Sequence, residues 1–286
     1  MPLDNALEII KNVPEIVDCI DLLLYHRPVP HREYDQIYMK ARYMLQQVSD
    51  IWPSLSNKNV VFLGDGDGMS LLFALLSSKY PMDIKSMSIM DFDERILHSL
   101  KEIEESQNLN CSLSYYLYNI INPVDSNLRQ KFDYFYINPP YGSKNNGLSC
   151  IMWLHRCMDL CSGNAEGCII VPFDDMFPWS VKSASAIIDF LNQSGFEITS
   201  IKKNAHQYHL GDNPTLKSSL IQVKRIRFSQ SAYHAQRFPL NMCLNLYGSP
   251  RAIPQYIYID NKNPFGNSDF NWEYGNISNF FPDAPL

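Results

Sequence analysis

Short apolar runs that alternate with helical segments constrain the fold of this chain more than any other feature of its sequence. The runs expected to form strands cover residues 59–64, 86–93, 112–120, 132–138 and 167–173. Apolar residues with helical spacing cover residues 69–78, 94–107, 148–161 and 180–193. Such alternation predicts an α/β fold with a mostly parallel, doubly wound sheet, in which ligands bind at the carboxyl ends of the strands.

The two ends of the chain differ from this alternating region. Residues 3–26 and 34–50 are expected to be helices, separated by the Pro28–Pro30 segment, which enforces an extended path. Two late segments are expected to complete a seven-stranded sheet as an antiparallel pair, at residues 196–209 and 218–227. Beyond residue 230 the chain is rich in Asn, Pro, Tyr and Phe, with one expected strand at 255–259. The predicted divisions are an N-terminal helical segment (1–56), a catalytic domain (57–230) and a C-terminal extension of unassigned role (231–286).

The overall charge argues against general electrostatic attraction to nucleic acid. Lys and Arg total 24 against 30 Asp and Glu, which gives a formal net charge of −6. The N-terminus carries acidic residues where a signal peptide would carry positive charge, and no apolar stretch is long enough to span a membrane. We therefore expect a cytoplasmic protein whose seven cysteines are buried structural thiols, with no metal site.

A glycine turn follows the first expected strand at Gly64–Gly68. Gly64, Gly66 and Gly68 would allow tight turning and a close backbone approach to a ligand. The interleaved Asp65 and Asp67 would repel a phosphate but suit a ligand that bears an ammonium or sulfonium charge. The alternative is a solvated turn with acidic residues near the N-terminus of a helix, where the helix dipole favours them.

Polar side chains also end the next two expected strands. Asp91 and Asp93 end the second strand, where a carboxylate can accept hydrogen bonds from both hydroxyls of a ribose, and the sequence does not choose between them. Asp93 could instead cap the following helix. Asn119 ends the third strand, where it could contact an adenine amine or form a plain turn.

The most specific motif is Asn138–Tyr141 (NPPY), at the end of the fourth expected strand. Pro139 and Pro140 fix the main chain, so the Asn138 side chain and the Pro139 carbonyl can act as paired hydrogen-bond acceptors for an amine or amide nitrogen. Tyr141 would stack on a planar acceptor or close the pocket. This arrangement would aim the nitrogen lone pair at an electrophilic carbon.

The order of these motifs resembles the class I S-adenosylmethionine-dependent amino-methyltransferases, whose fourth strand ends in (D/N)PP(Y/F/W). The resemblance implies a Rossmann-like class I methyltransferase fold. A closer resemblance over residues 28–175 is to the branched-chain polyamine synthase (N4-bis(aminopropyl)spermidine synthase) family. It rests on Arg32–Gln36 (REYDQ), the GDGD turn, the Asp91–Arg95 segment (DFDER) and the Pro-Pro motif. It places Asp35 and Gln36 among the donor-binding residues and Asp67 among the catalytic ones.

Two residues depart from the polyamine synthase pattern, in which the glycine turn reads GDDD and the later motif reads DPP. Gly66 and Asn138 each replace an acid. Carboxylates attract a polyamine and accept its proton, whereas an asparagine suits methylation of a nitrogen that is already neutral. Asp67 and Asp35 remain, so a cationic substrate is not excluded. The family's separate N-terminal winged-helix domain is expected to be absent from this chain.

We therefore expect an N-methyltransferase that uses S-adenosylmethionine and acts on an amine or amide nitrogen, with an adenine-like base as the preferred acceptor. The first alternative is an aminopropyltransferase that uses decarboxylated S-adenosylmethionine to make branched polyamines. The second is a non-catalytic, nucleoside-binding scaffold protein. The expected partners are thus a nucleic acid base, an amide or a polyamine. No membrane partner is expected, and a homodimer is one assembly compatible with the sequence.

Overall fold

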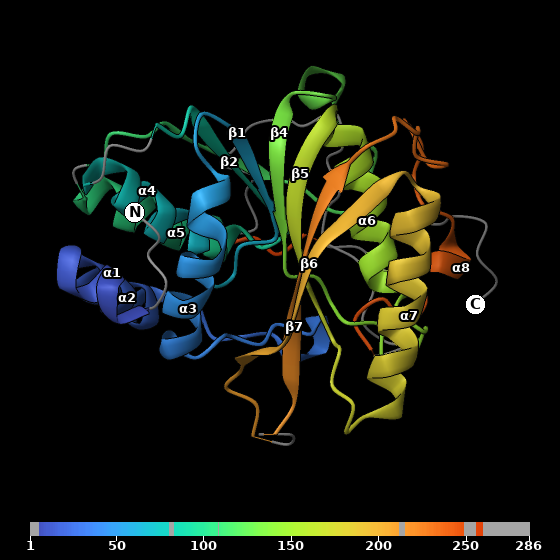
Figure 1. The fold of residues 1–286 in the computed structure, drawn as a ribbon, viewed down its shortest axis with the longest axis horizontal. Coiled ribbons are helices and arrows are strands. Elements are labelled where there is room, and N and C mark those ends of the chain that lie inside the picture. Colours follow the sequence, from blue (N-terminus) through green and yellow to red (C-terminus); the bar gives the residue numbers. More distant parts are fainter. Residues whose placement is uncertain (1–5, 80–82, 108, 212–214, 249–255, 260–286) are drawn as a thin grey trace.

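A computed structural model of the chain describes residues 6–79, 83–107, 109–211, 215–248 and 256–259. It contains a seven-stranded sheet in the order β3-β2-β1-β4-β5-β7-β6 (Figure 1). The strands are β1 (Asn59–Leu63), β2 (Ser86–Asp91), β3 (Leu113–Leu117), β4 (Phe132–Ile137), β5 (Cys161–Val171), β6 (Phe196–Gln207) and β7 (Lys217–Arg225). β1 to β5 pair in parallel, and β7 is antiparallel to both β5 and β6. This confirms the predicted class I methyltransferase-like fold.

Helices cover both faces of the sheet (Figure 1). The described helices are α1 (Ala6–Asn12), α2 (Glu15–His26), α3 (Ala41–Ile51), α4 (Met69–Lys79), α5 (Glu94–Ser106), α6 (Leu148–Leu160), α7 (Pro178–Gln193) and α8 (Leu240–Cys243). Short 3₁₀ turns lie at Arg32–Tyr34, Trp52–Ser54 and Ser126–Leu128. Helices α1 to α5 pack on one face, and α6 to α8 on the other.

Alternation along the strands divides the core between these two faces. Val60 and Phe62 of β1 point into the cluster that contains α1 to α5, whereas Val61 and Leu63 point into the cluster that contains α6 and α7. These central strands read as continuous apolar runs because both faces of a parallel sheet are buried. All seven cysteines are buried, as expected.

The N-terminal helices differ from the predicted ones. The helix expected at 3–26 is two helices, which separate at Val13–Pro14 because proline has no amide hydrogen to donate; residues 1–5 lie outside the described residues. The helix expected at 34–50 begins only at Ala41. The segment before it is extended, and its Met39 forms an isolated bridge with Tyr208.

Some strand boundaries also differ. The second strand ends at Asp91 rather than at residue 93, and the fifth begins at Cys161, six residues earlier than expected. The strand expected at 255–259 was wrong for the part that the structure describes, residues 256–259. There the only pairing is a bridge between Ile257 and Asp93. This bridge nevertheless brings the C-terminal extension to the end of β2.

Candidate functional site

A pocket of about 1010 Å³, including its open mouth, lies at the carboxyl ends of the central strands. Its wall includes Leu63 and Gly64 after β1, Met90 and Asp91 at the end of β2, and Asn138 after β4. This is the edge at which parallel α/β sheets bind ligands, because the loops after neighbouring strands meet there. The pocket therefore lies at the edge of the sheet where the sequence predicts a site.

Most of the predicted site residues line this one pocket. They are Asp35, Gln36, Gly64, Asp65, Gly66, Asp67, Asp91, Asn138, Pro139, Pro140 and Tyr141. Three predicted residues are not part of its lining: Gly68, Asp93 and Asn119. Each of these three has a different local role.

The position of Gly68 requires a glycine because of the local backbone and packing, not because of contact with the pocket. Its φ of +70° is unfavourable for other residues, and an added Cβ would lie 2.3 Å from a Leu23 methyl group of α2. Asp65, in the same turn, accepts hydrogen bonds from the amides of Met69 (2.8 Å) and Ser70 (3.0 Å) at the start of α4. Burial raises the pKa of Asp65 to about 7. The turn thus combines a helix cap with a pocket wall.

The two acids after β2 have separate roles. Asp91 lines the pocket and accepts hydrogen bonds from the amides of Asp65 (3.2 Å) and Asp93 (3.0 Å). Asp93 caps α5 through the Arg95 amide (3.0 Å), and its carboxylate also accepts from the Arg95 guanidinium and from Gln36. Of the two, Asp91 is therefore the carboxylate that lines the pocket. Burial raises its pKa to about 7.

Asn119 lies just behind the pocket wall. Its neighbours Tyr118 and Ile120 line the pocket, whereas its own side-chain oxygen accepts from the Ile121 amide at 3.2 Å and stabilises a turn. Its side-chain nitrogen is buried and has no hydrogen-bond partner among the described residues. Of the two roles considered for Asn119, stabilising a turn is the one that matches its side-chain oxygen contact.

The β4 end of the pocket is organised around Asp67. Its carboxylate accepts hydrogen bonds from the Met39 amide (2.7 Å) and from the Asn138 side-chain nitrogen (3.2 Å). The Arg27 guanidinium lies 3.6 Å from the same carboxylate, on the side of α2. Burial raises the pKa of Asp67 above its ordinary value, and Arg27 opposes that shift.

A chain of hydroxyl groups continues from the motif into the sheet. The Tyr141 hydroxyl donates to the Tyr208 hydroxyl (2.6 Å), which lies 2.7 Å from the Ser218 hydroxyl on β7. The Tyr141 amide donates to the Asp35 carboxylate at 3.4 Å. Asp35 has a φ of +57°, which turns the chain away from the preceding 3₁₀ turn. These contacts fix the backbone and ring of the motif.

Sequence reasoning missed several residues that line the pocket, and most of them come from outside the recognised motifs. Aromatic side chains account for most of them: Tyr34, Tyr38, Phe92, Tyr118, Tyr136, Trp153, Tyr208 and Tyr247. Tyr34 and Phe92 lie inside the REYDQ and DFDER segments, so their position beside acids could have identified them. Tyr247 lies in the C-terminal extension, where nothing in the local sequence indicates a pocket.

Comparison with known proteins identifies the family. A family profile described as the branched-chain polyamine synthase A C-terminal domain matches residues 15–243. The N(4)-bis(aminopropyl)spermidine synthase of Methanocaldococcus jannaschii is 27% identical over 133 residues, which are 46% of this chain and 36% of that relative. The chain thus spans little more than a third of this relative's length.

Solved structures agree in fold. The branched-chain polyamine synthase of Thermus thermophilus, in complex with N4-aminopropylspermidine and 5′-methylthioadenosine, superposes with a TM-score of 0.66 and 20% identity over 79% of this chain and 67% of that one. A candidate RNA methyltransferase from Pyrococcus horikoshii gives a TM-score of 0.53 and 13% identity over 74% of this chain and 99% of that one. The profile match covers most of the chain, and the chain therefore belongs to the branched-chain polyamine synthase family.

Proposed function

We propose that this protein is an aminopropyltransferase that moves the aminopropyl group of decarboxylated S-adenosylmethionine to a nitrogen of a polyamine. This was the first alternative in the sequence analysis, behind N-methylation. Family membership now favours it, because the named relatives are synthases of branched polyamines. The proposal also requires that the pocket suit a cationic donor and a cationic acceptor.

The charge of the pocket is the observation that carries the proposal. Among the described residues that line it, four are aspartates and none is a lysine or an arginine. The four are Asp35, Asp65, Asp67 and Asp91. Decarboxylated S-adenosylmethionine lacks the carboxylate of the parent donor, so both substrates of aminopropyl transfer carry only positive charge. Such ligands supply a counter-charge to Asp65 and Asp91, which form no ion pair with a described lysine or arginine, whereas Arg27 already lies 3.6 Å from the Asp67 carboxylate.

The residues at the ends of β1 and β2 suit the nucleoside part of the donor. Asp91 can accept hydrogen bonds from the ribose hydroxyls at the end of β2, and Gly64 and Gly66 let the backbone approach the donor closely. The acceptor would lie against Asn138–Tyr141, on the other side of β1. The new bond forms between the polyamine nitrogen and the aminopropyl carbon that is bonded to sulfur. That carbon–sulfur bond breaks, its electron pair stays on sulfur, and 5′-methylthioadenosine leaves.

The attacking nitrogen must also lose a proton. Asp67 is the group that we assign to accept it, because burial raises its pKa and so makes it a better base than an exposed aspartate. Asn138 donates to the Asp67 carboxylate, whereas an aspartate at position 138 would repel it. The asparagine is therefore compatible with aminopropyl transfer: one carboxylate stays as the base, and the amide holds it in place.

A donor-choice experiment tests the proposal. The purified protein is incubated with spermidine and either decarboxylated S-adenosylmethionine or S-adenosylmethionine, and the products are analysed by mass spectrometry. We expect an aminopropylated polyamine and 5′-methylthioadenosine with the first donor only. A methylated product from the second donor would support the N-methyltransferase hypothesis instead, and no product with either, nor with adenine-containing or amide acceptors, would support the scaffold.

Other expectations from the sequence remain predictions. They are the division at residues 56 and 230, the cytoplasmic location and the homodimer. No described helix is long and apolar enough to cross a bilayer.

A further inference from the structure

The C-terminal extension is fixed to the pocket by a buried arginine. Arg156 of α6 donates hydrogen bonds to four main-chain carbonyls on two segments. Ile120 (3.0 Å) and Ile121 (3.2 Å) follow β3, whereas Tyr233 (3.0 Å) and Gln236 (2.9 Å) belong to the extension. One side chain thus joins the extension to the loop whose Ile120 lines the pocket.

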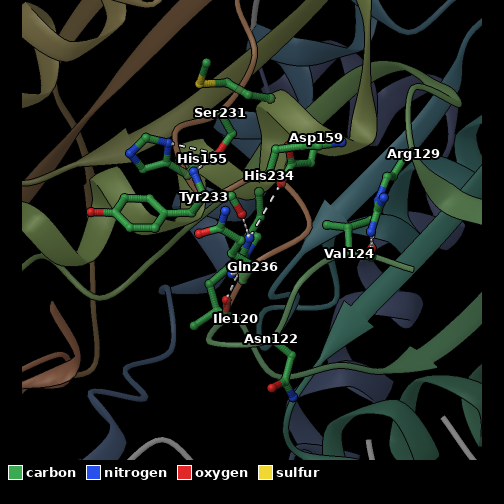
Figure 2. Close-up of polar contacts among 12 residues, drawn as sticks. Ile120, Asn122, Val124, Arg129, His155, Asp159, Ser231, Tyr233, His234 and Gln236 are labelled. Atoms are coloured by element: carbon green, nitrogen blue, oxygen red, sulfur yellow. Dashed lines mark hydrogen bonds and ion pairs between the residues drawn. The ribbon is translucent and has the colours of Figure 1, made fainter. Parts of the chain in front are cut away.

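Further contacts hold the same junction. Asp159 accepts a hydrogen bond from His234 at 2.8 Å (Figure 2). The Asp159 carboxylate also lies 3.5 Å from the Arg156 guanidinium. The Phe238 amide donates to the Ile121 carbonyl at 3.0 Å, and the Phe238 ring lies under the guanidinium. The extension therefore leaves β7 along a defined path.

A second anchor fixes the extension at the end of β2. The Ile257 amide donates to the Phe92 carbonyl (3.0 Å), and the Glu94 amide donates to the Ile257 carbonyl (2.9 Å). The Tyr256 hydroxyl accepts from the Asn119 amide at 3.3 Å. Of the described residues between the two anchors, Tyr247 lines the pocket.

Tyr247 lies between these anchors and points into the pocket. Its side chain is buried and is part of the pocket lining. Its ring centroid lies 5.2 Å from that of Tyr34 and 5.7 Å from that of Phe92, and the latter two are 5.6 Å apart. Its hydroxyl has no hydrogen-bond partner within the part of the chain that the structure describes.

The position of this aromatic trio identifies the ligand group that it would contact. Phe92 directly follows Asp91 at the end of β2, and β1 separates β2 from β4 in the sheet. The trio is therefore at the nucleoside end of the pocket, away from Asn138–Tyr141. An aromatic wall with a hydroxyl group suits an adenine nucleoside, which has planar rings, ring nitrogens and ribose hydroxyls.

We propose that Tyr247 is a nucleoside-binding residue: its hydroxyl hydrogen-bonds the adenosine part of the donor, and its ring completes an aromatic wall with Tyr34 and Phe92. The proposal rests on the proposed function only in requiring an adenosine-containing donor. Tyr247 lies beyond residues 15–243, which the family profile matches. The C-terminal extension, whose role the sequence left unassigned, thereby acquires a role in donor binding.

A purely structural role for Tyr247 would leave its hydroxyl unexplained. A buried hydroxyl without a partner destabilises a fold, and a phenylalanine would fill the same space without that cost. A ligand that pairs with the hydroxyl removes the penalty. The two roles therefore differ in what Tyr247→Phe does to stability and to binding.

The test measures 5′-methylthioadenosine binding by isothermal titration calorimetry and thermal stability for wild type, Tyr247→Phe and Tyr233→Phe. We expect Tyr247→Phe to weaken binding about tenfold, as for loss of one hydrogen bond, with an unchanged or higher Tm. Tyr233 is the matched control, because its ring packs on His155 and Phe238 outside the pocket lining. Wild-type affinity in Tyr247→Phe, or equal losses in both variants, would overturn the inference.

A second ligand separates this inference from the proposed function. S-adenosylhomocysteine, the by-product of methyl transfer, is titrated in parallel. If wild type binds it in preference to 5′-methylthioadenosine, aminopropyl transfer loses support, but a weakening by Tyr247→Phe still supports the role of Tyr247. If Tyr247→Phe affects neither ligand while wild type prefers 5′-methylthioadenosine, the inference fails and the proposed function stands. Binding of neither ligand to wild type overturns both.

Discussion

The Arg156 cluster and the aspartates of the pocket are both buried charges, but they are satisfied in different ways. Arg156 is fully buried, donates to four carbonyls, lies beside Asp159 and stacks on Phe238. Asp91 and Asp65 are also buried and accept hydrogen bonds from main-chain amides, and burial raises their pKa values to about 7. Among the described residues, no lysine or arginine lines the pocket beside them.

This contrast distinguishes buried charges that stabilise the fold from buried charges that are available to a ligand. A buried charge with a complete set of partners stabilises one arrangement of the chain, whereas a buried charge without a counter-ion is stabilised when a ligand of opposite charge binds. We therefore assign the Arg156 cluster to the architecture of the pocket and the aspartates to its ligands. Five predictions test this assignment.

Removing the guanidinium should have the largest effect on stability. Arg156→Met removes the guanidinium that donates to four carbonyls and lies beside Asp159, and we expect the free energy of unfolding to fall by about 3–5 kcal/mol in a urea titration. Arg129→Met is the matched control, because the Arg129 guanidinium donates to a single carbonyl among the described residues, that of Val124, and its loss should cost about 1 kcal/mol or less (Figure 2). Similar losses in both variants would contradict the architectural role.

Removing the assigned base should have the largest effect on catalysis. Asp67→Asn keeps the shape of the side chain but cannot accept the proton of the amine, so we expect kcat for aminopropyl transfer to fall about 10²–10³-fold. Binding of 5′-methylthioadenosine should change little, since Asp67 faces the acceptor. Asp175→Asn serves as the control, because Asp175 is exposed and pairs with Lys203. A decrease in kcat of less than about threefold would exclude Asp67 as the base.

The raised pKa of Asp91 predicts how donor binding depends on pH. With a pKa of about 7, Asp91 is mostly protonated at pH 6 and mostly ionised at pH 8. Only the ionised form accepts hydrogen bonds from both ribose hydroxyls, so affinity for 5′-methylthioadenosine should rise about tenfold from pH 6 to pH 8. Asp91→Asn should remove most of this rise, and titration calorimetry measures it. Equal pH dependence in wild type and variant would assign it to another group, such as Asp65.

The stability of the ligand-free protein should change with pH in the opposite direction. In the unfolded chain an aspartate ionises near pH 4, whereas folded Asp91 and Asp65 hold their protons to about pH 7. The folded state therefore binds more protons between these values, and these groups make stability fall as pH rises through that interval. Urea midpoints for wild type and Asp91→Asn provide the measurement, with a shallower dependence expected in the variant.

The hydroxyl chain beside the acceptor should have the smallest effect. Tyr208→Phe removes the hydrogen bonds to Tyr141 and Ser218, and we expect KM for the polyamine to rise about fivefold with less change in kcat. The ring of Tyr141 keeps its place through Asp35, which accepts from its amide. Tyr25→Phe is the control, because Tyr25 is 84% exposed. An unchanged KM would show that the hydroxyl chain does not position the motif.

Local pattern was sufficient for most of the sheet. Strands such as β1 and β4 are buried on both faces and therefore read as continuous apolar runs, and their ends carry the glycine turn and the Asn138–Tyr141 motif. Prediction failed where long-range contacts decide the backbone. Residues 35–40 have helical-looking spacing, but Met39 instead pairs with Tyr208 and donates to Asp67, which are distant in the sequence.

The sequence by itself determined the fold class, the edge of the sheet at which the pocket lies, and eleven residues that line this pocket. Periodicity and strand ends are local properties, so a linear chain displays them. Only the tertiary structure distinguished Asp91 from Asp93, because Arg95 and Gln36 occupy one carboxylate and leave the other facing the cavity. It also brought Tyr247 to the pocket, since the path of the extension depends on anchors at Arg156 and Ile257. Which side chains contact one another depends on their distance in space, and the spacing of residues along the chain does not determine that distance.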